Sequence, residues 1–179
     1  MTWKSFHSRG EILRDVIAVA NRRRDGALPL DVDGVADVFD DDLTLLGDLQ
    51  LRWHTRLAGR IERELLQQPM DLEKAVVAAW HATADELPGV LAILDRYRAD
   101  RHGAPLDQAT ADAMATSTAK ERILLAMMAG RVSVADDRAV RVGAEIERRA
   151  RASYQPQRSV THRGEQTRLL DRIKAALAA

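Results

Sequence analysis

His54 is one residue that could carry out acid–base or metal chemistry, because an imidazole titrates close to neutral pH. It belongs to a stripe spaced three or four residues apart, which predicts one shared helix face: Leu51, His54, Ala58, Ile61 and Leu65. A histidine in an apolar stripe is either a ligand or base in a buried site, or a core residue whose ring bonds a backbone carbonyl. We expect the second, structural role for His54.

A second histidine, His81, is followed one helical turn later by Asp85. Such a pair could bind a metal ion, or the carboxylate could orient the imidazole. Neither His-x-x-x-His nor the Glu-x-x-His of di-iron bundles occurs in the sequence. A site would require His54, His81 and carboxylates such as Glu64 to converge from separate helices. We therefore predict no metal and no cofactor, and we keep a metal- or anion-dependent enzyme site around His54 and His81 as an alternative.

A row of arginines accompanies the His54 stripe, with Arg52, Arg56 and Arg63 on one flank and Arg60 nearer the apolar side. Such a row can bind phosphate or carboxylate, although a solvated flank with pairs such as Arg60 and Glu64 is more common. We interpret it as a flank. The candidate ligand or partner surface predicted from these patterns consists of His54, His81, Asp85, Arg56, Arg60 and Glu64.

An acidic segment, residues 31–42, contains six aspartates and no basic residue. A calcium loop needs a glycine at its sixth position and a glutamate at its twelfth, whereas here Gly34 is fourth and Asp42 is twelfth. Capping of successive helices explains Asp33 and Asp40–Asp42 better. We therefore predict helix starts in this segment, and no calcium site.

Composition narrows the classes of function. The chain has no cysteine, which excludes a thiol nucleophile and a disulfide scaffold. No phosphate-binding glycine loop, nucleophile elbow or dinucleotide fingerprint occurs, so nothing argues for an enzyme. Arginine far outnumbers lysine and alanine is abundant, which favours a bacterial origin. Without an apolar run of membrane length or a signal-peptide core, the expected location is the cytoplasm.

The elements that must position these residues are helices, because alanine and leucine dominate and no segment alternates as a half-buried strand does. We predict an all-α single bundle of six or seven helices. The long central helix covers about 42–67, with Trp53 and Trp80 as core anchors on adjacent helices. The other helices are expected over 8–24, 71–86, 88–99, 107–129 with an interruption near 116–118, and from the Ser133–Asp136 cap to about 152.

The C-terminal part is predicted as a separate unit. Residues 1–152 are expected to form the bundle, 153–163 a linker, and 164–179 an amphipathic helix. Residues 1–100 carry 13 basic and 18 acidic side chains, whereas residues 101–179 carry 14 basic and 9 acidic side chains. The C-terminal part is therefore basic and suits an acidic surface. The tail docks on its own bundle or on a second copy, with a dimer slightly favoured. The expected dimer contacts are Leu169, Leu170, Ile173, Leu177, Arg168 and Arg172.

Taken together, these patterns favour a non-enzymatic protein-interaction or small-ligand-binding module that self-associates. The partner is expected to be a second copy or another protein, with no membrane involved. A nucleic-acid-associated factor that uses the basic C-terminal segment is a further alternative. Nucleic acid is the less favoured partner, because the net charge is zero and aromatic residues for base stacking are scarce.

Overall fold

A computed structural model describes residues 3–98 and 107–156 of the chain, with side chains from residue 9 onward. The described residues form seven helices and no strand, which confirms the all-α bundle. The helices are α1 (Trp3–Arg23), α2 (Val35–Val38), α3 (Asp42–Leu65), α4 (Leu72–Glu86), α5 (Pro88–Arg98), α6 (Gln108–Met128) and α7 (Asp137–Ser153).

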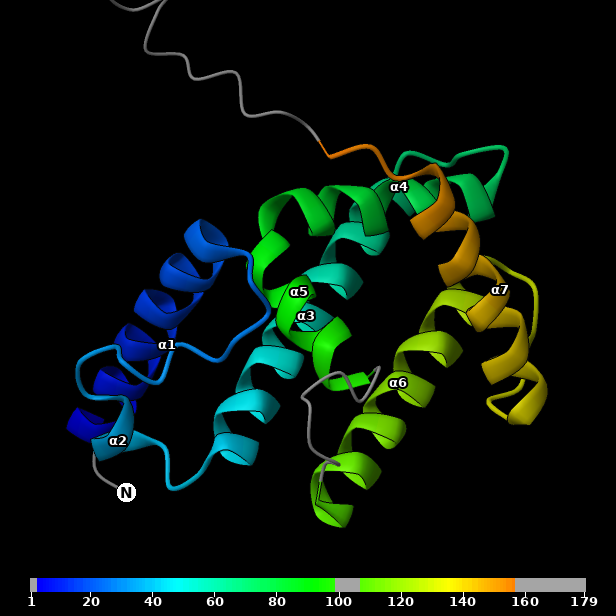
Figure 1. The fold of residues 1–179 in the computed structure, drawn as a ribbon. Helices are drawn as coiled ribbons and strands as arrows, with labels where there is room; N and C mark the ends of the chain where they lie inside the picture. Colours follow the sequence, from blue (N-terminus) through cyan, green and yellow to red (C-terminus); the bar gives the residue numbers. More distant parts are fainter. Residues whose placement is uncertain (1–2, 99–106, 157–179) are drawn as a thin grey trace, which may run out of the picture.

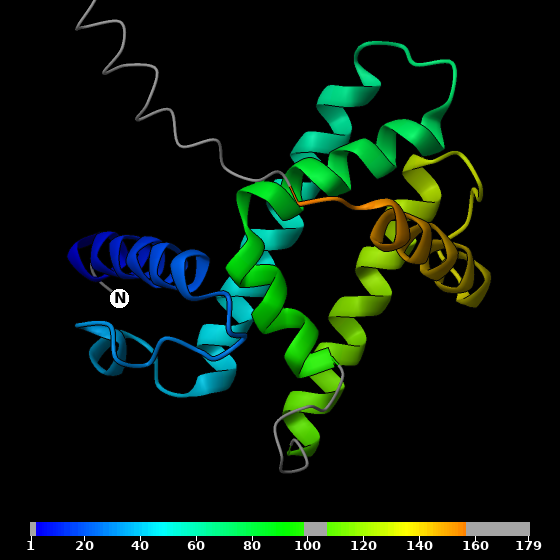
Figure 2. The same ribbon diagram turned by 45° about the horizontal axis from the view of Figure 1, so that its top comes forward.

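Helix α3 is the centre of the arrangement, as its length predicted. It contacts α1, α4, α5 and α6. Helices α1 and α2 lie on one side of the α3–α4–α5 group, and α6 and α7 lie on the other (Figure 1). Figure 2 shows the same division after rotation, with α1 and α7 at opposite sides of the molecule. The bundle therefore has two separate outer interfaces around one shared core.

Aspartate caps set the start of four helices. The carboxylates of Asp41, Asp71, Asp107 and Asp136 each accept a hydrogen bond from the amide three residues on, at 2.7–3.0 Å. These bonds satisfy amides that have no partner inside the helix, and the negative charge suits the positive end of the helix dipole. The capping role expected in the acidic segment is confirmed at Asp41 and wrong at Asp33, because the N-cap of α2 is Gly34 and no side chain caps that helix.

Two predicted boundaries were wrong. Helix α1 begins at Trp3 rather than at residue 8, because no glycine or proline interrupts residues 3–9. Helix α6 runs without a break through 116–118. Met114 and Glu121, on either side of this stretch, are buried, so packing of that face of α6 outweighs the weak helix propensity of Thr116, Ser117 and Thr118.

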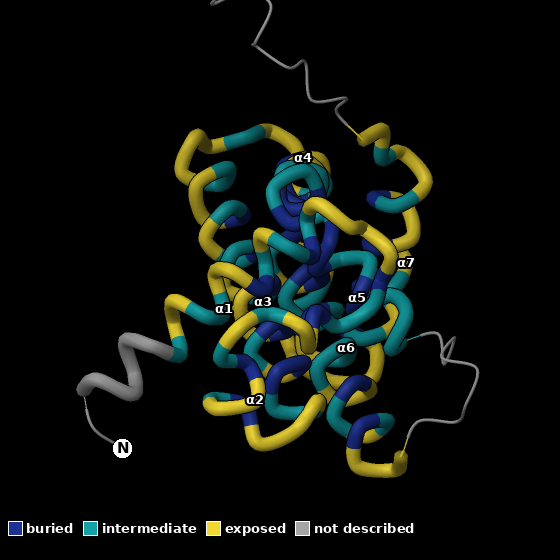
Figure 3. The backbone as a smooth tube through the Cα atoms, turned by 60° about the vertical axis from the view of Figure 1, so that its left-hand side comes forward, coloured by how far each residue is buried: buried dark blue, intermediate teal, exposed yellow. Residues whose placement is uncertain are grey.

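The apolar core centres on Trp53 of α3 and Trp80 of α4. Both side chains are fully buried, and their rings meet edge to face with centroids 6.0 Å apart. This confirms the prediction that the two tryptophans anchor adjacent helices. Tyr154, just after α7, adds a third ring whose centroid is 5.7 Å from that of Trp80. Figure 3 shows the buried residues concentrated in the middle of the bundle and the exposed residues at its loops and ends.

The buried face of α3 differs from the predicted stripe. Leu51 is 62% exposed, and His54 and Ala58 are only half-buried. Of the predicted stripe only Ile61 is buried, and the buried residues of α3 are Leu45, Leu46, Leu49, Gln50, Trp53, Leu57 and Ile61. Both patterns have helical spacing, and the contacts with α4, α5 and α6 decide which face is buried.

Two glycines allow helices to cross in backbone contact. A Cβ on Gly89 of α5 would lie 2.1 Å from the backbone carbonyl of Ala20 in α1. A Cβ on Gly143 of α7 would lie 1.9 Å from the carbonyl oxygen of Arg122 in α6. At the first crossing the Asn21 side chain also accepts a hydrogen bond from the Gly89 amide at 2.9 Å. Both outer interfaces therefore depend on a missing side chain.

The predicted C-terminal helix, 164–179, and most of the predicted linker lie outside the described residues. The same holds for Leu169, Leu170, Ile173 and Leu177 and for the basic pair Arg168 and Arg172. Within the described ranges, no helix has both the length and the apolar character of a membrane span.

Candidate functional site

The predicted pair of His81 and Asp85 holds the end of α7 against α4. The Nε2–H of His81 donates to the carbonyl oxygen of Ala150 at 2.8 Å. Asp85 accepts a hydrogen bond from the hydroxyl of Tyr154 at 2.8 Å. The His81 and Tyr154 rings also pack together, with centroids 5.6 Å apart. His81 and Asp85 lie one turn apart on α4, and both contact the end of α7.

The arginines of α3 pair with the next helix rather than with their own. Arg56 Nε and an Arg60 terminal nitrogen contact the two carboxylate oxygens of Glu86 at 2.8 and 2.5 Å. The expected pairing of Arg60 with Glu64 was therefore wrong, because Glu86, which ends α4, lies within reach of both arginines. Glu64 and His54 are half-buried on the same helix. The described part of the chain contains no group of three or more His, Asp or Glu side chains placed to hold one metal ion.

A buried ionic cluster joins α3, α5, α6 and α7. At its centre Arg98 of α5 contacts Glu121 of α6 at 2.6 Å, and Glu121 is only 1% exposed. Gln50 of α3 lies 3.5 Å from both partners and so completes a triangle across three helices. Burying these charges is favourable only because each ion has an oppositely charged or polar partner.

The cluster continues onto α7 through Glu147. Its carboxylate contacts Arg122 at 3.0 Å, Arg151 at 2.9 Å and Arg98 at 3.5 Å. Arg151 in turn holds Asp95 through two hydrogen bonds of 2.8 and 2.9 Å. Burial opposes ionisation of Glu147, yet the surrounding guanidiniums outweigh it and keep the pKa of this carboxyl below its usual range. Glu147 therefore stays charged at neutral pH.

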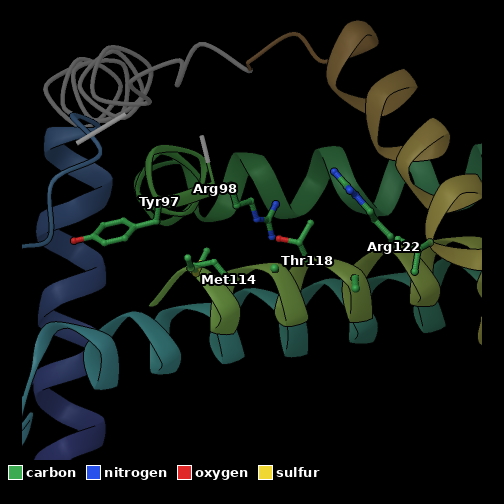
Figure 4. Close-up of a pocket in the computed structure, with 9 residues that line it drawn as sticks. Tyr97, Arg98, Met114, Thr118 and Arg122 are labelled. Carbon is green, nitrogen blue, oxygen red and sulfur yellow. The ribbon is translucent and has the colours of Figure 1, made fainter. Parts of the chain in front are cut away.

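A cleft of about 450 Å³ opens beside this cluster, between α5, α6 and the start of α7 (Figure 4). Its walls are made by Tyr97, Arg98, Ala111, Met114, Ala115, Thr118, Ala119, Arg122 and Val140. Two of these residues are arginines and none is acidic. Figure 4 shows the Arg98 side chain reaching over α6 toward Thr118, with Arg122 further along the same helix.

The two arginines of the cleft retain hydrogen-bonding capacity. Arg122 uses Nε for Glu147, and no partner within the described residues faces its two terminal nitrogens. Arg98 uses one terminal nitrogen for Glu121 and Gln50, and its other terminal nitrogen lies 3.5 Å from the carboxylate of Glu147, so its Nε is the donor without a partner among the described residues. The terminal nitrogens of Arg122, which is 35% exposed, are therefore the donors that an anion in the cleft would contact first.

The opposite end of the cleft is apolar. Met114 is buried, and Ala111 and Ala115 leave the wall shallow because their side chains are small. Tyr97 lines this end (Figure 4), and burial raises the pKa of its phenol, so the hydroxyl stays neutral. The cleft therefore combines cationic groups at one end with an apolar wall at the other.

Sequence reasoning missed this site, since Arg98, Glu121, Arg122 and Glu147 were not candidates. One signal was present. Thr110, Met114, Glu121 and Leu125 recur on the buried face of α6 at helical spacing, so an acidic residue occupies a core position. A carboxylate on such a face needs a buried cation, and Arg98 could then have been sought on a neighbouring helix.

Comparison with known proteins adds no relative: no protein-family model matches the chain, and no curated protein or solved structure matches it significantly. The geometry of the described residues is therefore the basis for assigning a function.

Proposed function

We propose that this protein is a non-enzymatic binding module that takes a small organic anion into the cleft between α5, α6 and α7. The single observation that carries the proposal is the lining of the cleft, which among the described residues has two arginines and no acidic side chain, with both terminal nitrogens of Arg122 without a protein partner there. Its volume of about 450 Å³ falls within the range of small-molecule sites.

The residues of the cleft favour binding over chemical conversion. Among the described residues that line it there is no histidine or carboxylate, the usual acid–base groups, and Tyr97 is held neutral. Arg98 is fixed in place by Glu121 and Gln50, which gives a preorganised cation rather than a mobile one. A carboxylate of the ligand is expected beside Arg98, Thr118 and Arg122, and its apolar body beside Met114.

The test is a calorimetric titration of the full chain with benzoate and with its uncharged analogue benzamide. Benzoate is expected to bind and benzamide to bind far more weakly. Arg122→Gln should weaken benzoate binding by about tenfold, because a charge-assisted hydrogen bond contributes roughly 1.5–3 kcal/mol. Ala119→Leu should abolish binding by filling the cleft without removing a charge. Arg52→Gln, on the exposed flank of α3, is the matched control and should change nothing.

Equal binding of benzoate and benzamide would contradict the assignment of an anion site. Unchanged benzoate affinity in Ala119→Leu would place the ligand somewhere other than this cleft. Circular dichroism of each variant separates loss of binding from loss of fold.

A second function, self-association, is favoured by an exposed apolar patch at the end of the bundle. Leu66 is 80% exposed and Met70 is fully exposed in the α3–α4 loop, and Met127 and Val134 project from the region between α6 and α7. The two loops are neighbours, because a Cβ on Gly130 would lie 3.1 Å from Leu72 and Arg131 contacts Glu73 at 3.6 Å. Clustered apolar side chains of this kind are typical of protein-contact surfaces.

We therefore propose that the protein forms a homodimer through this patch. Light scattering of the full chain should give twice the chain mass, and Leu66→Glu with Met70→Glu should give the mass of one chain. The matched control is Leu51→Glu, which alters an exposed leucine elsewhere on α3 and should leave the dimer intact. A wild-type monomer would contradict the proposal. Bacterial origin and cytoplasmic location stay predictions from the sequence.

A further inference from the structure

A shallow apolar groove of about 360 Å³ lies between α1 and α3, on the far side of the bundle from α7. Leu13 of α1 and Leu51 of α3 line it, and Leu51 leaves most of its surface uncovered. Gly10 widens the groove, since no atom lies within 4 Å of the position that a Cβ would take. A groove between two helices is a suitable site for the apolar side of a third.

One rim of the groove adjoins the acidic segment, residues 31–42. Arg9, which lines the groove, contacts Asp48 at 2.8 Å and donates to the carbonyl oxygen of Val38 at 3.4 Å. Its guanidinium also stacks 4.6 Å from the centre of the Phe39 ring. Of the six aspartates in the acidic segment, only Asp31 has an ion-pair partner among the described residues, namely Arg23. Among the described residues, the charged ones that line the groove itself are Arg9, Arg52 and Asp48, so the excess negative charge lies in the acidic segment beside it, where Asp40 is close enough to act on Arg9.

The described chain ends at a place from which this groove can be reached. Pro156 and Tyr154 line the same surface hollow as Arg24, which directly follows α1. From Arg24 back to Leu13 the rise along α1 is about 16 Å at about 1.5 Å per residue. The eight residues 157–164 can extend up to about 27 Å. The following residues can therefore reach the groove of their own chain.

The sequence beyond Pro156 has the chemistry that the groove requires. Residues 157–179 carry five basic and two acidic side chains. Leu169, Leu170, Ile173 and Leu177 have the spacing of one apolar helix face, with Arg168 and Arg172 four residues apart along its flank. We propose that residues 165–178 bind the α1–α3 groove of the same chain as an amphipathic helix, with their basic flank toward the acidic segment.

The test uses the absence of native cysteine, because any disulfide must then come from introduced residues. In the full-length double variant Leu51→Cys/Ile173→Cys, mild oxidation is expected to give a disulfide within one chain, identified by peptide mass. The matched control Ser133→Cys/Ile173→Cys has the same tail cysteine and an exposed partner in the α6–α7 loop, and it should not cross-link. Leu51 is exposed, so its replacement leaves the core intact.

The other possible cross-linking results would contradict either the binding site, the chain that supplies the helix, or the role of the acidic segment. No cross-link, or equal cross-linking of both pairs, would show that the tail does not bind this groove. A disulfide between two chains would make a second copy the donor of the helix. Adding Arg168→Glu and Arg172→Glu should slow the intrachain cross-link severalfold, and an unchanged rate would remove the acidic segment from the recognition. Whether benzoate binds does not affect any of these results.

Discussion

The contact between α3 and α4 is apolar, whereas the junction of α5, α6 and α7 is formed by buried charged side chains. The first is closed by the buried rings of Trp53 and Trp80. The second is closed by Arg98, Glu121 and Glu147, which are almost as inaccessible. Apolar contacts are non-directional, whereas a buried ion is stable only beside its partners. The apolar contact holds the body together, and the ionic junction fixes the positions of the cationic groups beside the cleft.

The largest expected loss of stability comes from disrupting the apolar contact between α3 and α4. Trp53→Ala should lower the free energy of unfolding by roughly 3–5 kcal/mol, because it leaves a cavity where a fully buried indole was. Denaturant titration followed by circular dichroism measures the loss. Leu30→Ala, on an exposed leucine between α1 and α2, should change stability by less than about 0.5 kcal/mol. A loss below about 1 kcal/mol in Trp53→Ala would mean that the ring does not anchor the core.

Breaking the buried ion pair of Arg98 and Glu121 should lower the free energy of unfolding slightly less, and a second substitution should restore much of the loss. Arg98→Met should destabilise the fold by about 3 kcal/mol, since the carboxylate of Glu121 is left buried without its cation. The double variant Arg98→Met/Glu121→Met should recover much of that loss, because it removes the orphaned charge as well. The measurement is a double-mutant cycle by denaturant titration. Additive losses would show that the two side chains are not coupled.

The close crossing of α6 and α7 can be tested without changing any charge. Gly143→Ala should destabilise by about 2 kcal/mol, because the new Cβ would displace the carbonyl of Arg122 and separate the two helices. Gly47→Ala is the matched control, since its Cβ would meet nothing within 4 Å. That substitution should stabilise α3 by about 0.5 kcal/mol. Equal thermal midpoints for the two variants would contradict the crossing.

Acid should weaken the ionic junction before the apolar core. The pKa of Glu147 is lower in the folded protein than in the unfolded chain. The ionised carboxylate therefore stabilises the folded state above about pH 4.3, and this contribution to the free energy of unfolding is lost as the pH falls through the pKa of the folded state. Stability measured across this range should therefore decline, and Glu147→Gln should decline less steeply. Glu62→Gln, on an exposed residue of α3, serves as control and should follow the wild type.

The smallest expected effect is at Tyr154, where the two regions meet. Burial, together with the hydrogen bond to Asp85, raises its pKa to about 12. The folded state therefore favours the protonated phenol, and its contribution, intact below about pH 10, is lost as the pH rises toward the folded value. Tyr154→Phe should lower stability at neutral pH by about 1 kcal/mol and flatten this alkaline decline. An unchanged alkaline profile would show that the phenol has no raised pKa.

Sequence alone determined the helical class, the long helix α3 and the burial of Trp53 and Trp80 on adjacent helices. These follow from local information: helix propensity, aspartates at helix starts, and apolar residues at helical spacing. Such signals act within one turn or one helix, so they can be recognised without knowing the partner helix.

Tertiary structure alone decided which face of α3 is buried and which charges meet. Leu51 and Trp53 both suit a buried stripe, and packing against α4 and its neighbours selected Trp53. Arg60 could pair with Glu64 on its own helix but pairs with Glu86. Glu121 and Arg98 are 23 residues apart, and nothing local links them until α5 and α6 pack together. Charge pairing depends on distances of a few ångströms between separate helices, and only the fold sets those distances.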